Sequence, residues 1–165
     1  MPLHAEGEGR LAIVGLGPGK IEYMTGRALE AIREAEFILG HSTYLEPLQP
    51  LLSEKTVLSS SMGKEVDRAK KAIDLARTHA VAIVSGGDAG IYGMASIVLE
   101  VLEHEGIQIN VEIIPGVTAA TAAASRAGSP LSGDYATISL SDLLTPLEVI
   151  EKRLSDHAKV EASVM

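Results

Sequence analysis

Short runs of apolar residues, each closed by glycine, proline or polar residues, recur along the chain. Runs of three or four mostly apolar residues suit short strands that are buried in a parallel sheet covered by helices. Such runs predict strands at residues 11–14, 37–39, 56–58, 81–84 and 111–114. Residues 135–140 instead alternate between apolar and polar side chains, which predicts a sixth, half-buried strand.

Apolar residues between these runs recur at helical spacing. They predict helices at residues 23–36, 65–78, 92–102, 118–128 and 146–156. Thr25 is the expected N-cap of the first helix, and Gly106 is the expected stop after the third. We expect residues 41–50 to form a loop ending in a short helix, and residues 59–63 to form a second loop.

Strands and helices that alternate along the whole chain predict an α/β fold with a mostly parallel sheet. The composition shifts at residues 129–134, which are the expected domain boundary. Residues 1–128 would then form the N-terminal domain, and residues 129–165 the start of a second α/β domain. One strand and one helix are too little for a core of their own, so this second domain is expected to be truncated.

Composition narrows the classes of function. The chain has 14 Lys and Arg against 22 Asp and Glu, with a net charge of −8 and no basic cluster, which argues against nucleic acid as a partner. It has no cysteine, which excludes disulfides and thiolate metal sites. No apolar stretch approaches the roughly 20 residues that cross a bilayer, and residues 1–10 lack a signal core. We therefore expect a cytoplasmic protein without a membrane partner.

The first strand runs into a glycine-rich loop, Gly15-Leu16-Gly17-Pro18-Gly19. Glycines let the backbone approach a ligand closely, as in dinucleotide-binding proteins. The spacing here is G-x-G-x-G, however, and the second strand ends in Gly40-His41 where an acidic residue would bind ribose. An NAD-dependent oxidoreductase is therefore disfavoured, and a P-loop is excluded because no G-K-[ST] triplet follows at the required spacing. A simple tight turn is the alternative.

A second glycine-rich loop, residues 85–94, follows the strand at 81–84. Open α/β sheets bind ligands at the carboxyl ends of their strands, so this loop is a candidate binding site. Asp88 lies among its glycines, and it would accept a hydrogen bond from a ligand, cap the helix that follows, or serve both roles.

A third turn, Pro115-Gly116-Val117-Thr118-Ala119, has the same strand-to-helix form. Capping of the helix is the better interpretation of Thr118 taken alone. The five histidines show no metal-ligand spacing, and no nucleophile–base arrangement is visible. Several ligand loops without catalytic side chains are typical of a reaction that depends on positioning an already activated cofactor.

The three loops together resemble those of the tetrapyrrole methylases, which use S-adenosylmethionine. The resemblance covers residues 10–155 and rests on VGLGPG (14–19), residues 24–46, SGGDAGIYGMASIVLEVLE (85–103) and residues 114–154. It implies S-adenosylmethionine-dependent C-methylation of a tetrapyrrole in corrin synthesis. Within the family, residues 114–154 are most similar to members that methylate C17 of a precorrin-3B-type or cobalt-precorrin-3 substrate, with ring contraction.

The resemblance also implies a set of site residues. Contacts to the methyl donor would come from Pro18, Gly86, Gly87, Asp88, Ile91, Thr118 and Ala119. The tetrapyrrole would lie over residues 41–44 and 59–63, no residue is assigned to catalysis, and no metal site is expected. The family further implies a homodimer. Lys20 is a departure, since many relatives have Asp or Ser after the GPG triplet.

Two alternatives remain open at this point. One is a sibling methylase with another acceptor, such as uroporphyrinogen, a diphthine precursor or, least favoured by the acidic charge, ribosomal RNA. The other is a non-catalytic fragment, because the chain ends soon after the expected second domain begins.

Overall fold

The computed structural model describes residues 9–142 and 145–162, and its centre is a five-stranded sheet with the order β3-β2-β4-β1-β5. All four pairings in the sheet are parallel, which confirms the predicted fold class. The strands are β1 (Arg10–Gly15), β2 (Phe37–His41), β3 (Thr56–Ser60), β4 (Ala80–Ser85) and β5 (Asn110–Ile114). Each predicted apolar run therefore forms a strand.

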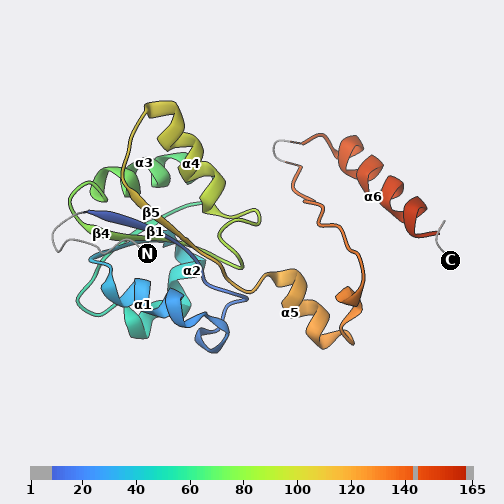
Figure 1. Cartoon of the computed structure of the whole chain (residues 1–165), viewed down its shortest axis with the longest axis horizontal. Helices are drawn as coiled ribbons and strands as arrows, with labels where there is room; N and C mark the ends of the chain where they lie inside the picture. The colour runs from blue at the N-terminus through green and yellow to red at the C-terminus, as the bar shows by residue number, and fades with distance from the viewer. Residues whose placement is uncertain (1–8, 143–144, 163–165) are drawn as a thin grey trace. The chain divides into compact units, whose positions relative to one another are not determined.

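Helices fill the connections between the strands (Figure 1). They are α1 (Gly26–Glu34), α2 (Ser42–Leu45), α3 (Glu65–Leu75), α4 (Met94–Glu105), α5 (Ala119–Arg126) and α6 (Leu147–Ala162). Three short 3-10 helices accompany them: η1 (Ile21–Tyr23), η2 (Glu46–Leu51) and η3 (Pro130–Ser132). None of the helices in the described parts of the chain combines the length and apolarity needed to cross a membrane.

The sheet separates two apolar layers. On one face, Ile13 and Ile83 pack against Ile73 of α3 and Val98 of α4, all buried. On the other, Val14 and Val84 pack with the α1 residue Ile32. Figure 1 shows the same division, with α3 and α4 on one side of the sheet and α1 and α2 on the other. Successive residues along β1, and likewise along β4, point to opposite faces of the sheet. Because both faces are covered, the central positions of these two strands have to be apolar.

Both predicted caps are confirmed. The Thr25 Oγ1 accepts a hydrogen bond from the Ala28 backbone N–H at 3.1 Å, at the start of α1. Gly106 ends α4 with a left-handed φ of 64°, a conformation that glycine adopts at little cost.

The chain divides into two compact units, residues 1–123 and 124–165. In the second unit the expected helix is present as α6, but the strand predicted at residues 135–140 is wrong, because these residues have no strand partner. Tyr135 and Leu140 are 56% and 69% exposed, so the alternation of apolar side chains does not mark a buried face here. The domain boundary at 128/129 stays a prediction.

Candidate functional site

The crevice at the carboxyl ends of β1 and β4 follows from the chain topology. The chain leaves β1 toward α1 on one face of the sheet, whereas it leaves the neighbouring β4 toward α4 on the other face (Figure 1). Ligands of open α/β sheets bind where adjacent connections diverge in this way. The first two glycine-rich loops lie at this point, since they directly follow β1 and β4.

Two main-chain hydrogen bonds join these loops. The Gly17 N–H donates to the Gly87 carbonyl at 3.0 Å, and the Gly87 N–H donates to the Gly17 carbonyl at 2.8 Å. Both residues have positive φ angles, 75° and 65°, which explains why glycine is needed at the two positions. The pair fixes the first loop against the second without using a side chain.

Asp88 connects the second loop to the third. Its Oδ2 accepts the Gly116 backbone N–H at 2.9 Å, and its Oδ1 accepts the Gly90 N–H at 2.8 Å. The helix-capping interpretation of Asp88 is wrong, because α4 begins at Met94 and has Gly93 as its N-cap, with no capping side chain. At the start of α4 the Ala95 N–H instead donates to the Ala89 carbonyl at 2.9 Å.

The third loop packs directly on the other two. A Cβ atom at Gly116 would overlap the carbonyl oxygens of both Gly87 and Gly15. The three loops therefore meet at one point, where only a residue without a side chain fits. The sequence predicts three separate ligand loops, and the structure shows that they form one braced unit.

The residues that the resemblance assigned to the donor lie on this unit. Pro18 and Ile91 are exposed, while Gly86, Gly87 and Asp88 are partly buried. Thr118 caps α5, since its Oγ1 accepts the Thr121 N–H at 3.1 Å, as expected for a helix start. Ala119 is exposed at the beginning of the same helix. Their role as ligand contacts stays a prediction.

An apolar recess opens beside the first loop. Its volume is about 300 Å³, including the space open to solvent, and its walls include Leu16, Met24, Tyr44 and Leu48. Gly86 forms another wall, and a Cβ there would approach the Tyr44 Cε1 to 2.8 Å. A side chain at residue 86 would therefore press on the Tyr44 ring, which forms part of the same wall. Lys20 lies at its rim.

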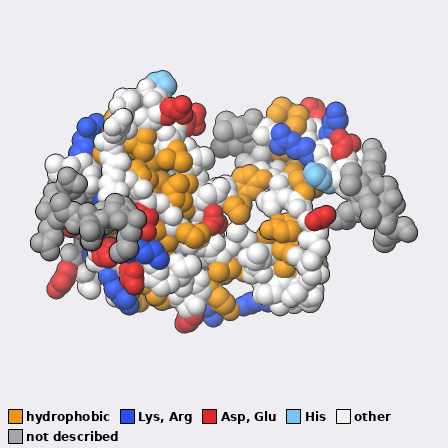
Figure 2. All heavy atoms as spheres, viewed as in Figure 1, with side chains coloured by type: hydrophobic (Ala, Val, Ile, Leu, Met, Phe, Trp, Pro, Cys, Tyr) orange, Lys and Arg blue, Asp and Glu red, His pale blue; other side chains and the backbone are white. Residues whose placement is uncertain are grey.

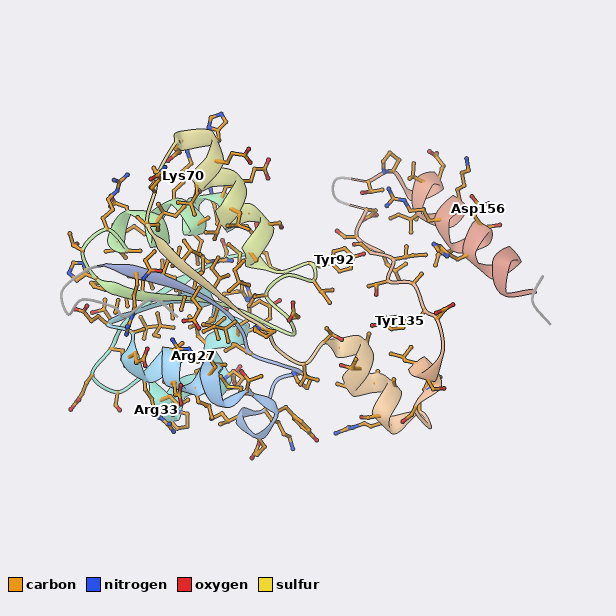
Figure 3. The ribbon with its side chains drawn as sticks, in the orientation of Figure 1. Arg27, Arg33, Lys70, Tyr92, Tyr135 and Asp156 are labelled. Atoms are coloured by element: carbon orange, nitrogen blue, oxygen red, sulfur yellow. The ribbon has the colours of Figure 1, made fainter. Side chains whose placement is uncertain are left out.

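Tyr92 has an uncommon backbone conformation at the end of the second loop, where Figure 3 labels it. It adopts a left-handed φ of 53°, and its side chain is 68% exposed. Such a conformation costs a bulky residue roughly 1–2 kcal/mol, and strained residues of this kind concentrate at functional sites.

Two polar residues that sequence reasoning missed lie near the carboxyl edge. Arg68 of α3 is only 5% exposed, and Ser85, at the end of β4, has a buried Oγ without a hydrogen-bond partner in the described chain. Arg68 could have been found from the sequence, because it lies one turn before Ala72 on the apolar stripe of α3.

Charged side chains elsewhere form surface pairs. Arg27 of α1 makes two hydrogen bonds to Glu112 of β5, at 2.6 and 2.8 Å, and these bonds raise its pKa. The Nζ of Lys70, in α3, lies 2.7 Å from the Oε1 of Glu105, in α4. Figure 3 places Arg27 and Lys70 on opposite sides of the sheet, and Figure 2 shows basic and acidic groups interspersed on the face it presents. Within residues 9–142 and 145–162, no three His, Cys, Asp or Glu side chains gather as a metal site would need.

Comparison with protein families matches residues 10–165 to the tetrapyrrole (corrin/porphyrin) methylases. The chain is 50% identical over 146 residues to the cobalamin biosynthesis protein CbiHC of Archaeoglobus fulgidus, covering 88% of this chain and 33% of that protein. It is 47% identical over 145 residues to a probable cobalt-factor III C(17)-methyltransferase of Salmonella typhimurium, covering 87% of this chain and 60% of the relative. The chain thus spans less than two thirds of either relative.

Solved structures agree with this result. The methyltransferase CobJ superposes with a TM-score of 0.85 at 38% identity, over 92% of this chain and 64% of that one. A uroporphyrin-III C-methyltransferase of Thermus thermophilus in complex with S-adenosylhomocysteine superposes with a TM-score of 0.61 at 27% identity, over 76% of this chain and 54% of that one. With its parallel sheet and its three braced loops, the chain belongs to the tetrapyrrole methylase family.

Proposed function

We propose that this chain takes part in S-adenosylmethionine-dependent methylation of C17 of a tetrapyrrole of the cobalt-factor III or precorrin-3B type, in cobalamin biosynthesis. Ring contraction belongs to the same proposal, with no side chain assigned to it. The observation that carries the proposal is the bracing of three glycine-rich loops at the divergence of β1 and β4, in a chain that is 47% identical to a probable cobalt-factor III C(17)-methyltransferase.

The residues present fit such a donor. Gly86 and Gly90 bring exposed or partly exposed backbone to the crevice, and the apolar recess beside Gly86 accepts an uncharged part of a ligand. Each carboxylate oxygen of Asp88 already accepts one hydrogen bond, but each has two lone pairs. Asp88 therefore retains the capacity to accept a hydrogen bond from the donor as well.

When bound, S-adenosylmethionine supplies an electrophilic methyl group, whose bond to sulfur breaks as the new bond to C17 forms. The chain itself would contribute position. The hydrogen-bonded pair Gly17–Gly87 and the Asp88–Gly116 bond fix the loops before the ligand arrives. Such preorganisation lowers an activation barrier by several kcal/mol in favourable cases, up to roughly 7–11 kcal/mol.

Calorimetric titration with S-adenosylhomocysteine tests this proposal. We expect the wild-type chain to bind, and Asp88→Ala to bind at least tenfold more weakly, because the loops lose their connection. Asp74→Ala is a matched control, since Asp74 is an exposed carboxylate near the end of α3. Equal affinity of Asp88→Ala and wild type would contradict the role of Asp88, and a wild type that does not bind would contradict the proposal itself.

The acceptor is a separate question. Methyl transfer from labelled S-adenosylmethionine should favour cobalt-factor III over uroporphyrinogen III and over a diphthine precursor. Preference for one of the latter would make the chain a sibling methylase, and binding without transfer would make it a non-catalytic fragment. A homodimer in the cytoplasm completes the proposal, and light scattering of the purified chain tests the assembly.

A further inference from the structure

Arg68 is a buried cation without a counter-ion. Its side chain leaves α3 and is covered to 95%, since only 5% of the residue is exposed. Its Nε donates to the Ser60 Oγ at 2.7 Å, its Nη2 to the Ser61 carbonyl at 3.1 Å, and its Nη1 contacts the Met94 Sδ at 3.6 Å. All three partners are neutral, and none of the ion pairs found in the described part of the chain includes Arg68.

The guanidinium of Arg68 stays charged despite its burial, because its pKa is too high for deprotonation in a protein. A buried charge is costly unless an opposite charge or strong hydrogen bonds offset its lost hydration. The thioether of Met94 is only a weak acceptor. Among the described residues, Arg68 therefore has no negatively charged partner that would offset the cost of burying its charge.

The hydrogen bond from Arg68 sets the direction of the Ser60 hydroxyl. Since Nε donates to the Ser60 Oγ, the hydroxyl hydrogen points elsewhere, and the described residues offer it no acceptor. Ser60 is half-buried at the carboxyl end of β3, and Ser61 beyond it is exposed. Ser60 thus presents a hydrogen-bond donor, backed by a positive charge, at the edge where the sheet binds ligands.

His41 supplies a second donor beside Ser60. The two residues are partners in the parallel pairing of β2 and β3, so the pleat directs both side chains to the same face of the sheet. The His41 Nδ1 accepts the Thr43 N–H at 3.2 Å, which places the proton of a neutral ring on Nε2. Ser60 and His41 therefore each offer one hydrogen-bond donor from the same face of the sheet, and of the two it is the Ser60 hydroxyl that contacts the buried guanidinium.

We propose that Arg68, Ser60 and His41 form a carboxylate-binding subsite at the carboxyl ends of β2 and β3. A ligand carboxylate would accept from the two donors and supply the charge that Arg68 lacks. The inference rests on the proposed function, whose two ligands both carry carboxylates. These are the methionine carboxylate of the donor and the acetate and propionate groups of the tetrapyrrole.

Titration calorimetry of the full chain with three probes distinguishes the two sources. S-adenosylhomocysteine has the amino-acid carboxylate, 5′-methylthioadenosine lacks it, and cobalt-factor III carries only the tetrapyrrole carboxylates. The variants are Arg68→Met, which removes the charge, and Arg68→Lys, which keeps it without the planar fork. Lys71→Met is the matched control, because Lys71 is an exposed cation on the same helix.

We expect Arg68→Met to weaken one carboxylate ligand roughly tenfold to a hundredfold, with 5′-methylthioadenosine unaffected. Loss of S-adenosylhomocysteine affinity identifies the donor as the source, and loss of cobalt-factor III affinity identifies the acceptor. Either result supports the subsite. Affinities equal to those of Lys71→Met, or an equal loss for all three probes, would overturn it.

Two further measurements keep the test decisive. If Arg68→Met does not fold, Ser60→Ala replaces it, because this variant removes the hydroxyl that the guanidinium contacts, and wild-type affinity for both carboxylate ligands in Ser60→Ala overturns the subsite. Arg68→Lys keeps the charge and should keep most of the affinity. If the wild type binds none of the probes, the proposed function has failed on its own. Tricarballylate then tests the subsite: it should raise the Tm of the wild type and of Lys71→Met but not of Ser60→Ala. A shift of equal size in all three would count against the subsite.

Discussion

The Asp88 carboxylate and the Gly116 N–H join the β4–α4 loop to the β5–α5 loop across 2.9 Å. The same carboxylate accepts the Gly90 N–H with its other oxygen. One side chain thus fixes the main chain of two loops through its two acceptor oxygens.

Asp88→Asn removes one of these acceptors while keeping the size of the side chain. An amide has a single oxygen, so one of the two N–H groups loses its partner, and the free energy of unfolding should fall by roughly 1–3 kcal/mol. Urea denaturation followed by circular dichroism measures the change. Asp74→Asn should stay within about 0.5 kcal/mol of wild type, as is usual for exposed positions. An equally small change in Asp88→Asn would show that at least one of the two bonds made by Asp88 contributes little to stability.

Gly116→Ala should separate the three loops. The new methyl group would overlap the Gly87 and Gly15 carbonyl oxygens, which belong to the backbone and cannot rotate away. We expect a loss of about 1–3 kcal/mol or more in unfolding free energy, together with weaker binding of S-adenosylhomocysteine. Gly26→Ala is the control, because a Cβ there meets nothing within 4 Å and the residue lies in α1. Full ligand affinity in Gly116→Ala would contradict the close approach of the loops.

Gly86 and Tyr44 should behave as a coupled pair. Gly86→Ala places a methyl group 2.8 Å from the Tyr44 Cε1, so the variant should be less stable by roughly 1–3 kcal/mol. Tyr44→Leu removes the conflicting ring atoms, and the double variant should recover part of the loss. A double-mutant cycle in thermal unfolding should give a coupling of about 0.5–3 kcal/mol. Strict additivity of the two substitutions would mean that the ring and residue 86 do not interact.

The Lys70–Glu105 pair predicts a pH dependence of stability. The hydrogen bond and charge of Lys70 lower the pKa of Glu105 from its ordinary 4.5, and those of Glu105 raise the pKa of Lys70 from 10.5. A lowered carboxyl pKa stabilises the fold above about pH 4.5, and this contribution is lost as the pH falls through the folded value. A raised amine pKa contributes below about pH 10.5 and is lost as the pH rises through the folded value.

Glu105→Gln should therefore be slightly less stable than wild type near neutral pH, and the difference should vanish at both acid and alkaline extremes. Thermal unfolding across this pH range at low salt measures it, and added salt should reduce it because the pair is exposed. A difference that persists at acid pH would contradict the assignment to this ion pair.

Much of the fold was predictable because its three central strands, β2, β4 and β1, lie in a sheet covered on both faces. The apolar run at residues 81–84 predicts a buried strand, and it forms one. Thr25 and Gly106 mark helix ends because a hydroxyl caps a helix start and a glycine adopts the left-handed conformation at a helix end. The predicted strand at 135–140 failed because alternation records only side-chain type, whereas a strand also needs a partner.

The site was predictable in its position but not in its internal bonds. Glycine-rich loops after strands locate the crevice, but an Asp before a helix looks the same whether it caps that helix or holds a distant loop. Gly116 is 28 residues from Asp88, and no local pattern records that contact. In α3, Val66 was predicted to lie on the buried face of the helix, but it is 50% exposed. Arg68, two residues further along the helix, is buried instead.

The Gly17–Gly87 pair, finally, bears on how the sequence of such a site is free to vary. The two hydrogen bonds use only main-chain atoms. The first and second loops therefore stay together without any particular side chain in either loop. What has to be retained is the absence of a side chain at a few positions, such as Gly116. Residues around the loops can therefore vary while the main-chain frame of the loops stays the same.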